Sequence, residues 1–211
     1  MKKGIIFDLD GTLWDSAGAV TRSWNIALSK IDEFQVRIDR TDMMRFMGNL
    51  LFDIGRMMLP ENLGDKRVQQ IVDLCIEHEH AYLREHGAPL YENLLKTLQD
   101  LRKDYSLYIV SNCQAGYIEV FLDYFGLWDV FEDYECPGRT GLLKGDNIRL
   151  ICERNSLDKA VYVGDTHGDY TATMQAGLPF IHAAYGYGRP HASTPAVTRF
   201  DRLPTLVKEI L

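Results

Sequence analysis

Short apolar runs alternate with amphipathic stretches along much of the chain. Four apolar runs predict buried parallel strands, and they cover residues 4–7, 107–110, 160–163 and 180–184. Segments with apolar residues at helical spacing precede the second run and separate the later ones, over 92–103, 115–125, 146–154 and 169–176. This alternation predicts an α/β fold with a doubly wound parallel sheet.

The chain between the first two predicted strands follows a different pattern. It contains no convincing strand, and four stretches read as helices, over 21–31, 41–47, 50–59 and 65–86. A crossover between parallel strands usually takes about a dozen residues. We therefore expect an inserted helical cap over 16–87, and a Rossmann-like core made of 1–15 and 88–211. The tail over 190–204 carries three prolines and is expected to form a surface loop before a short closing helix.

Charge and composition narrow the classes of partner. The formal charge is −7 over 211 residues, so no general attraction to nucleic acid or to an anionic membrane is expected. No apolar run approaches the ~20 residues of a membrane span, and the first one ends at Asp8, too early for a secretory leader. The four cysteines form no C-x-x-C pair, as is typical of reduced thiols. We expect a cytoplasmic protein with a small-molecule partner, and the sequence leaves open monomer or dimer.

Polar side chains follow the predicted strands at the points where the strands end. In open α/β sheets, ligands bind beyond the carboxyl ends of the strands. The candidate residues are Asp8, Asp10 and Thr12 after the first strand, Ser111 and Asn112 after the second, Lys144 before a helix, and Asp165 and Asp169 around GDTHGD. All of them are expected to face one crevice.

The carboxylates in this set indicate a metal site. Asp8 and Asp10 are two residues apart, so they can point to the same side of an extended chain, and a divalent cation would offset their repulsion. Asp165 and Asp169 would add oxygen atoms at the same edge, and a set of oxygen ligands favours Mg²⁺. Thr12 and Ser111 carry hydroxyl groups and Lys144 carries an ammonium group, and no protein acceptor for these donors is in view in the sequence. They indicate that a phosphoryl group binds beside the metal.

These residues carry a resemblance to a known family. The segment DLDGT, the serine after a hydrophobic strand, the isolated Lys144 and the segment GDTHGD resemble the four motifs of the haloacid dehalogenase-like superfamily, in the same order. The helical insertion is similar to that of members with a helical cap, and phosphoglycolate phosphatase-like proteins are the nearest subgroup.

The resemblance implies a role for each matching residue. Asp8 would be the nucleophile and a metal ligand, and Asp10 would be the acid/base that also lends its backbone carbonyl to the metal. Asp165 would bind the metal, with Asp169 orienting ligands around it. The residues that would hold the phosphoryl oxygens are Thr12, Ser111, Asn112 and Lys144. Arg45, Gly48 and Asn49 lie at a predicted turn between cap helices, where similar proteins place a substrate-reading loop.

The function that follows is a Mg²⁺-dependent phosphatase of small phosphorylated metabolites, phosphoglycolate-like or sugar phosphates, acting through an aspartyl phosphate. A β-phosphoglucomutase-like phosphotransferase is an alternative, although such proteins place a histidine soon after the first motif and the first histidine here is His78. A pyrophosphatase remains open. A further alternative is a phosphate-sensing module in which the aspartyl phosphate persists, but such modules lack a long helical insertion.

Overall fold

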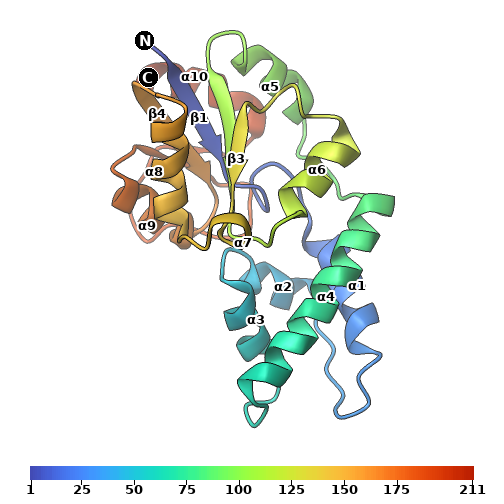
Figure 1. Cartoon of the computed structure of the whole chain (residues 1–211). Coiled ribbons are helices and arrows are strands. Elements are labelled where there is room, and N and C mark those ends of the chain that lie inside the picture. Colours follow the sequence, from blue (N-terminus) through green and yellow to red (C-terminus); the bar gives the residue numbers. More distant parts are fainter.

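A six-stranded parallel sheet forms the centre of the protein in a computed structural model that describes all 211 residues. The strand order is β3-β2-β1-β4-β5-β6, with β1 in the middle (Figure 1). The strands are β1 Lys3–Phe7, β2 Ser106–Val110, β3 Asp133–Glu135, β4 Lys159–Gly164, β5 Phe180–Ala183 and β6 Ala196–Val197. The doubly wound α/β fold expected from the sequence is thereby confirmed.

Helices cover both faces of this sheet, and four more follow β1. Those of the sheet region are α5 Leu94–Leu101, α6 Tyr117–Phe125, α7 Pro137–Thr140, α8 Lys144–Arg154, α9 His167–Ala176 and α10 Leu203–Ile210, with a short 3₁₀ turn at Phe200–Arg202. Those after β1 are α1 Ala17–Leu28, α2 Arg40–Phe46, α3 Leu51–Met58 and α4 Asp65–His86. None of them combines the length and the apolar character needed to cross a membrane.

The buried strands explain why the sequence shows continuous apolar runs. Ile5 and Phe7 lie in a large apolar cluster on one face of the sheet, with residues of α5, α6 and α10. Ile6, between them in sequence, lies in a second cluster with Ile148 and Ile151 of α8. Because successive side chains of a strand point to opposite faces, a sheet covered on both sides needs apolar residues at every position.

The two outer strands were not predicted from the sequence. β3 is three residues long and reads DYE, and β6 has two residues inside the tail that was expected to be a loop. Each pairs with a neighbouring strand on one side only. Such short edge strands bury too little surface to show an apolar run, so the sequence pattern does not reveal them.

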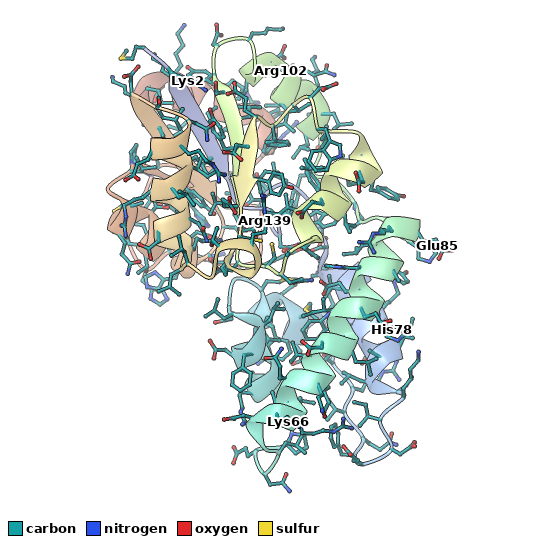
Figure 2. All side chains as sticks on the ribbon, viewed as in Figure 1. Lys2, Lys66, His78, Glu85, Arg102 and Arg139 are labelled. Atoms are coloured by element: carbon teal, nitrogen blue, oxygen red, sulfur yellow. The ribbon has the colours of Figure 1, made fainter.

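Helices α1 to α4 lie beyond the carboxyl ends of the strands, at the opposite end of the molecule from the two termini (Figure 1). The helix predicted over 65–86 matches α4, which packs along α1 and α3. Figure 2 shows Lys66, His78 and Glu85 distributed along α4, whereas Lys2 and Arg102 lie at the far end of the sheet. The division into a core and a cap at residues 15/16 and 87/88 stays a prediction, since one apolar cluster contains residues from both parts.

Two leucines of α5 test how this helix is packed against the sheet. Leu98 is fully buried, whereas Leu95 is 43% exposed. Replacing Leu98 by alanine should lower the free energy of unfolding by about 2 to 5 kcal/mol, because the cavity left behind cannot fully collapse. Leu95→Ala should change it by less than about 0.5 kcal/mol. Urea denaturation of both variants measures the difference, and equal losses would contradict this packing.

Candidate active site

Three buried carboxylates meet where the strand order reverses. Asp8 follows β1 and Asp165 follows β4, the strand that pairs with β1, so both lie at the carboxyl edge of the sheet. Asp169 comes from the first turn of α9. One carboxylate oxygen from each of the three lies within 4.8 Å of the other two. In parallel sheets this reversal opens a crevice for ligands.

The first turn of α9 holds Asp169 in place. Thr166 is the N-cap, and its hydroxyl accepts a hydrogen bond from the Asp169 backbone N–H. Oδ2 of Asp169 in turn accepts from the Thr166 N–H at 2.9 Å, the Thr166 hydroxyl at 2.7 Å and the Asp165 N–H at 3.2 Å. This is a capping box, and it fixes the Asp169 side chain beside Asp165.

Lys144 is the counter-charge of the cluster. Its Nζ donates to Asp8 Oδ1 at 2.7 Å and to Asp169 Oδ1 at 2.5 Å, and its side chain is only 5% exposed. Burial alone would lower the pKa of Lys144, but the Asp169 and Asp8 carboxylates outweigh it and hold the pKa well above the usual range. The expectation that Lys144 has no protein acceptor is therefore wrong, because the fold brings two acceptors from distant segments to it.

The cluster retains carboxylate oxygens without a protein donor. Asp165 Oδ2 accepts from the Tyr187 backbone N–H at 2.6 Å, but its Oδ1 is buried without any partner. No protein donor contacts Asp8 Oδ2. Burial raises the pKa of Asp165 well above its usual range and that of Asp8 to about 7, although Lys144 lowers the latter. An unpaired buried carboxylate oxygen is costly, so the site fits a hard cation.

Asp10 lies apart from the three clustered carboxylates and has a different environment. Its Oδ1 accepts from Trp14 Nε1 at 2.8 Å, from the Tyr117 hydroxyl at 2.8 Å and from the Ser16 hydroxyl. No protein donor contacts its Oδ2. Burial raises the pKa of Asp10, and the three donors only partly offset this. The side chain of Asp10 is thus held through one oxygen, which leaves the other able to carry a proton.

The predicted phosphate-binding residues have different surroundings. Ser111 and Asn112 line the same cavity as Asp8 and Asp10. The Thr12 hydroxyl is buried without a partner. Asn112 donates from Nδ2 to the Gly48 carbonyl at 2.9 Å, and its Oδ1 has no partner. Asn112 therefore links the sheet edge to the loop between α2 and α3.

The predicted substrate-reading residues divide between two spaces. Gly48 and Asn49 line the cavity that contains Asp8 and Asp10. Arg45 instead forms an exposed ion pair with Asp42 and lines a neighbouring groove with Gly48 and Asn49. The structure brings the loop over the carboxylates, but it places the Arg45 guanidinium outside their cavity.

Several residues of the site were missed by the sequence analysis. Trp14 and Ser16 follow Asp10 by four and six residues, so a local turn could have suggested their contact with it. Tyr117 and Tyr187 reach the site from other segments, and nothing in their surroundings in sequence marks them. Long-range contacts of this kind depend on the fold.

Comparisons with known proteins agree with this geometry. Residues 5–183 match the haloacid dehalogenase-like hydrolase family, and the chain belongs to it. Over 98% of the chain it is 30% identical to a phosphoglycolate phosphatase of Rhodospirillum rubrum, covering 90% of that protein. It is 29% identical to a phosphoglycolate phosphatase of Aquifex aeolicus, over 97% of the chain and 94% of that relative. The crystal structure of a predicted phosphatase from Clostridium acetobutylicum superposes with a TM-score of 0.81 at 23% identity, covering 99% of both chains.

A glycine of the DLDGT segment tests how tightly the cluster is packed. Gly11 has φ +80°, and a Cβ atom there would lie 2.3 Å from Asp165 Oδ2. Gly11→Ala should displace the Asp165 carboxylate and lower phosphate release from an aryl phosphate about 100-fold, the scale expected for a misplaced functional group. Gly141→Ala is the matched control, because Gly141 has φ +72° with nothing within 4 Å. The control should cost about 1 kcal/mol in stability and keep its activity; equal activity of the two variants would contradict this account.

Proposed function

We propose that the protein is a Mg²⁺-dependent phosphatase that hydrolyses small phosphate monoesters through an aspartyl phosphate. The observation that carries this proposal is the buried arrangement of Asp8, Asp165 and Asp169 around Lys144, with oxygens of Asp8 and Asp165 that lack a protein donor. Burying like charges this close to one another lowers the stability of the fold, so their presence indicates a function that requires them. Cation binding and phosphoryl transfer both require such a group of charges.

The carboxylates of Asp8 and Asp165 would hold the metal, together with the Asp10 backbone carbonyl. Asp169 would orient the site, because protein donors already occupy both of its oxygens. When bound, Mg²⁺ would offset the repulsion between carboxylates and withdraw charge from the phosphoryl oxygens.

Asp8 is the proposed nucleophile. Lys144 holds its Oδ1 at 2.7 Å, which leaves Oδ2 to attack phosphorus. The new Oδ2–P bond forms as the bond between phosphorus and the ester oxygen breaks, and the alcohol departs. Water then attacks the phosphorus of the aspartyl phosphate, which releases inorganic phosphate and restores the Asp8 carboxylate.

Asp10 is the proposed acid and base. It would give the proton on Oδ2 to the departing alcohol and later take a proton from the attacking water. Its raised pKa favours the protonated form that the first step needs. Trp14, Ser16 and Tyr117 hold Oδ1, so the carboxyl group keeps one orientation through both steps.

Donors around Asp8 would bind the phosphoryl oxygens. The hydroxyl groups of Thr12 and Ser111 and the Asn112 side chain are the nearest candidates. The Lys144 ammonium has three protons, and two of them are used by Asp8 and Asp169. The third remains for a phosphoryl oxygen. Residues of the cap line the cavity opposite these donors and would exclude bulk water during the reaction.

The relatives support the class of substrate. Two proteins that align with nearly the whole chain are named phosphoglycolate phosphatases, so a monoester of a small molecule is the expected substrate. Phosphoglycolate-like compounds and sugar phosphates both belong to this class.

Replacing the nucleophile tests the covalent route. Wild-type protein should release phosphate from p-nitrophenyl phosphate over many turnovers with Mg²⁺ and should lose this activity with a chelator. Asp8→Asn removes the attacking carboxylate and should lower kcat at least about a thousandfold. Colorimetric assay of phosphate over time measures both effects.

The control for this substitution is Asp104→Asn, which makes the same change at an exposed position and should leave the rate unchanged. Activity of Asp8→Asn close to that of wild type would refute the aspartyl phosphate. A single burst of p-nitrophenol, with the phosphoryl group retained on the protein and no further turnover, would refute the enzyme in favour of a phosphate-sensing module.

A further inference from the structure

Glu79 interrupts an otherwise apolar stripe of α4. The other buried side chains of this helix are Val68, Ile71, Val72, Cys75 and Leu83. Glu79 lies at the helical spacing of this stripe and is 3% exposed, where an apolar residue would stabilise the packing. No cation pairs with it. Burying a carboxyl group without one is unfavourable, so the position needs an explanation beyond packing.

Two donors hold the Glu79 carboxyl group in a fixed orientation. Trp24 Nε1 of α1 donates to Oε2 at 2.5 Å, and Gln114 Nε2, in the loop after β2, donates to Oε1 at 2.7 Å. Burial raises the pKa of Glu79 to about 8, which these two hydrogen bonds only partly offset. The ionised form, which only accepts hydrogen bonds, prevails above this pH, so the specificity assays below are made at a pH above this value. Each carboxyl oxygen still has a lone pair for another donor.

Glu79 lines the cavity that contains Asp8 and Asp10. The part of this cavity contributed by α1, α2 and α3 is apolar, and its residues are Val20, Trp24, Met43, Leu51 and Ile54. No lysine, arginine or histidine lines it, and the ionisable carboxyl groups in it are Asp8, Asp10 and Glu79. Its volume is about 40 Å³, which is room for a few water molecules, so a small alcohol fits this space more readily than a large one.

The alcohol part of the substrate has to occupy this space. Its oxygen must lie within hydrogen-bond distance of Asp10 to receive the proton, and Asp10 and Glu79 line the same cavity. Lys144 is held by Asp8 and Asp169 and is assigned to the phosphoryl group. Arg45 and Arg189 line the neighbouring groove, which includes neither Asp8 nor Asp10. A carboxylate on the alcohol would therefore be desolvated without a counter-charge, which costs far more than burying a hydroxyl that finds an acceptor.

We infer that the substrate is a phosphate ester of a small alcohol that carries a second hydrogen-bond donor, a hydroxyl or an ammonium group, and no carboxylate, and that Glu79 accepts the hydrogen bond from this group. This inference rests on the proposed phosphatase activity and narrows its substrate. The inferred substrate of this chain differs from phosphoglycolate, the substrate in the names of its relatives, because phosphoglycolate carries a carboxylate.

Four two-carbon esters test this specificity, since they differ only at the far end of the alcohol. They are 2-hydroxyethyl phosphate, phosphoethanolamine, ethyl phosphate and phosphoglycolate. For wild type, kcat/KM should be at least about tenfold higher for the better of the first two than for ethyl phosphate or phosphoglycolate, the scale of one hydrogen bond. The faster of these two identifies the donor. A preference for phosphoglycolate or ethyl phosphate would overturn the inference.

Variants of Glu79 show whether this residue carries the preference. Glu79→Leu should bring the ratio of kcat/KM between the donor ester and ethyl phosphate close to one. Glu79→Gln keeps a hydrogen-bonding side chain of the same shape, so it should fold even where the leucine variant does not. It should also reduce discrimination against phosphoglycolate, because its amide can donate to a carboxylate. Wild-type discrimination against phosphoglycolate in the glutamine variant, or wild-type ratios in a folded leucine variant, would assign Glu79 to packing alone and overturn the inference.

Two controls separate this inference from the proposed function. Glu77→Gln makes the same change at an exposed position of α4 and should leave all four rates unchanged. Wild-type turnover of p-nitrophenyl phosphate but of none of the four esters would overturn the inference and leave the phosphatase activity standing. No turnover of any phosphate ester would overturn the phosphatase function as well.

Discussion

The repulsion among buried carboxylates at the end of β1 and β4 is the constraint on which the rest of the structure depends. Asp8, Asp165 and Asp169 lie together with Lys144 as the only protein cation bonded to them. The fold places them there because β1 and β4 are neighbours and because the first turn of α9 holds Asp169 through a capping box. A protein selected for stability alone would bury apolar groups at this position; the proposed binding of a cation and a phosphoryl group would account for the cluster.

The helices after β1 complete the site through a few polar contacts. Asn112 donates to the Gly48 carbonyl, and Gln114 donates to Glu79. Both belong to the loop after β2, so the residues that follow Ser111 contact the segment between β1 and β2 at two places. This loop therefore joins the sheet edge to the segment between β1 and β2, beside the cavity that Asp8, Ser111 and Glu79 line.

Sequence patterns predicted the features of the fold and the site that depend on residues close together in the chain. The apolar runs predicted β1, β2, β4 and β5 because each is buried on both faces. The motifs singled out Asp8 and Asp165, which directly follow β1 and β4, and Asp10, two residues beyond Asp8. The edge strands β3 and β6 were missed because they bury little surface. The pairing of Lys144 with Asp169 and the contact of Tyr117 with Asp10 join segments far apart in sequence, and only the fold determines them.

The central claim is that one divalent cation binds between Asp8 and Asp165, and titration calorimetry with Mg²⁺ on the phosphate-free protein tests it most directly. The account predicts one ion per chain for the wild type and an affinity at least about tenfold lower for Asp165→Asn, which removes a charged ligand but keeps the shape of the side chain. Equal binding of Mg²⁺ by the wild type and by Asp165→Asn would contradict it, as would a folded wild-type protein that binds no Mg²⁺.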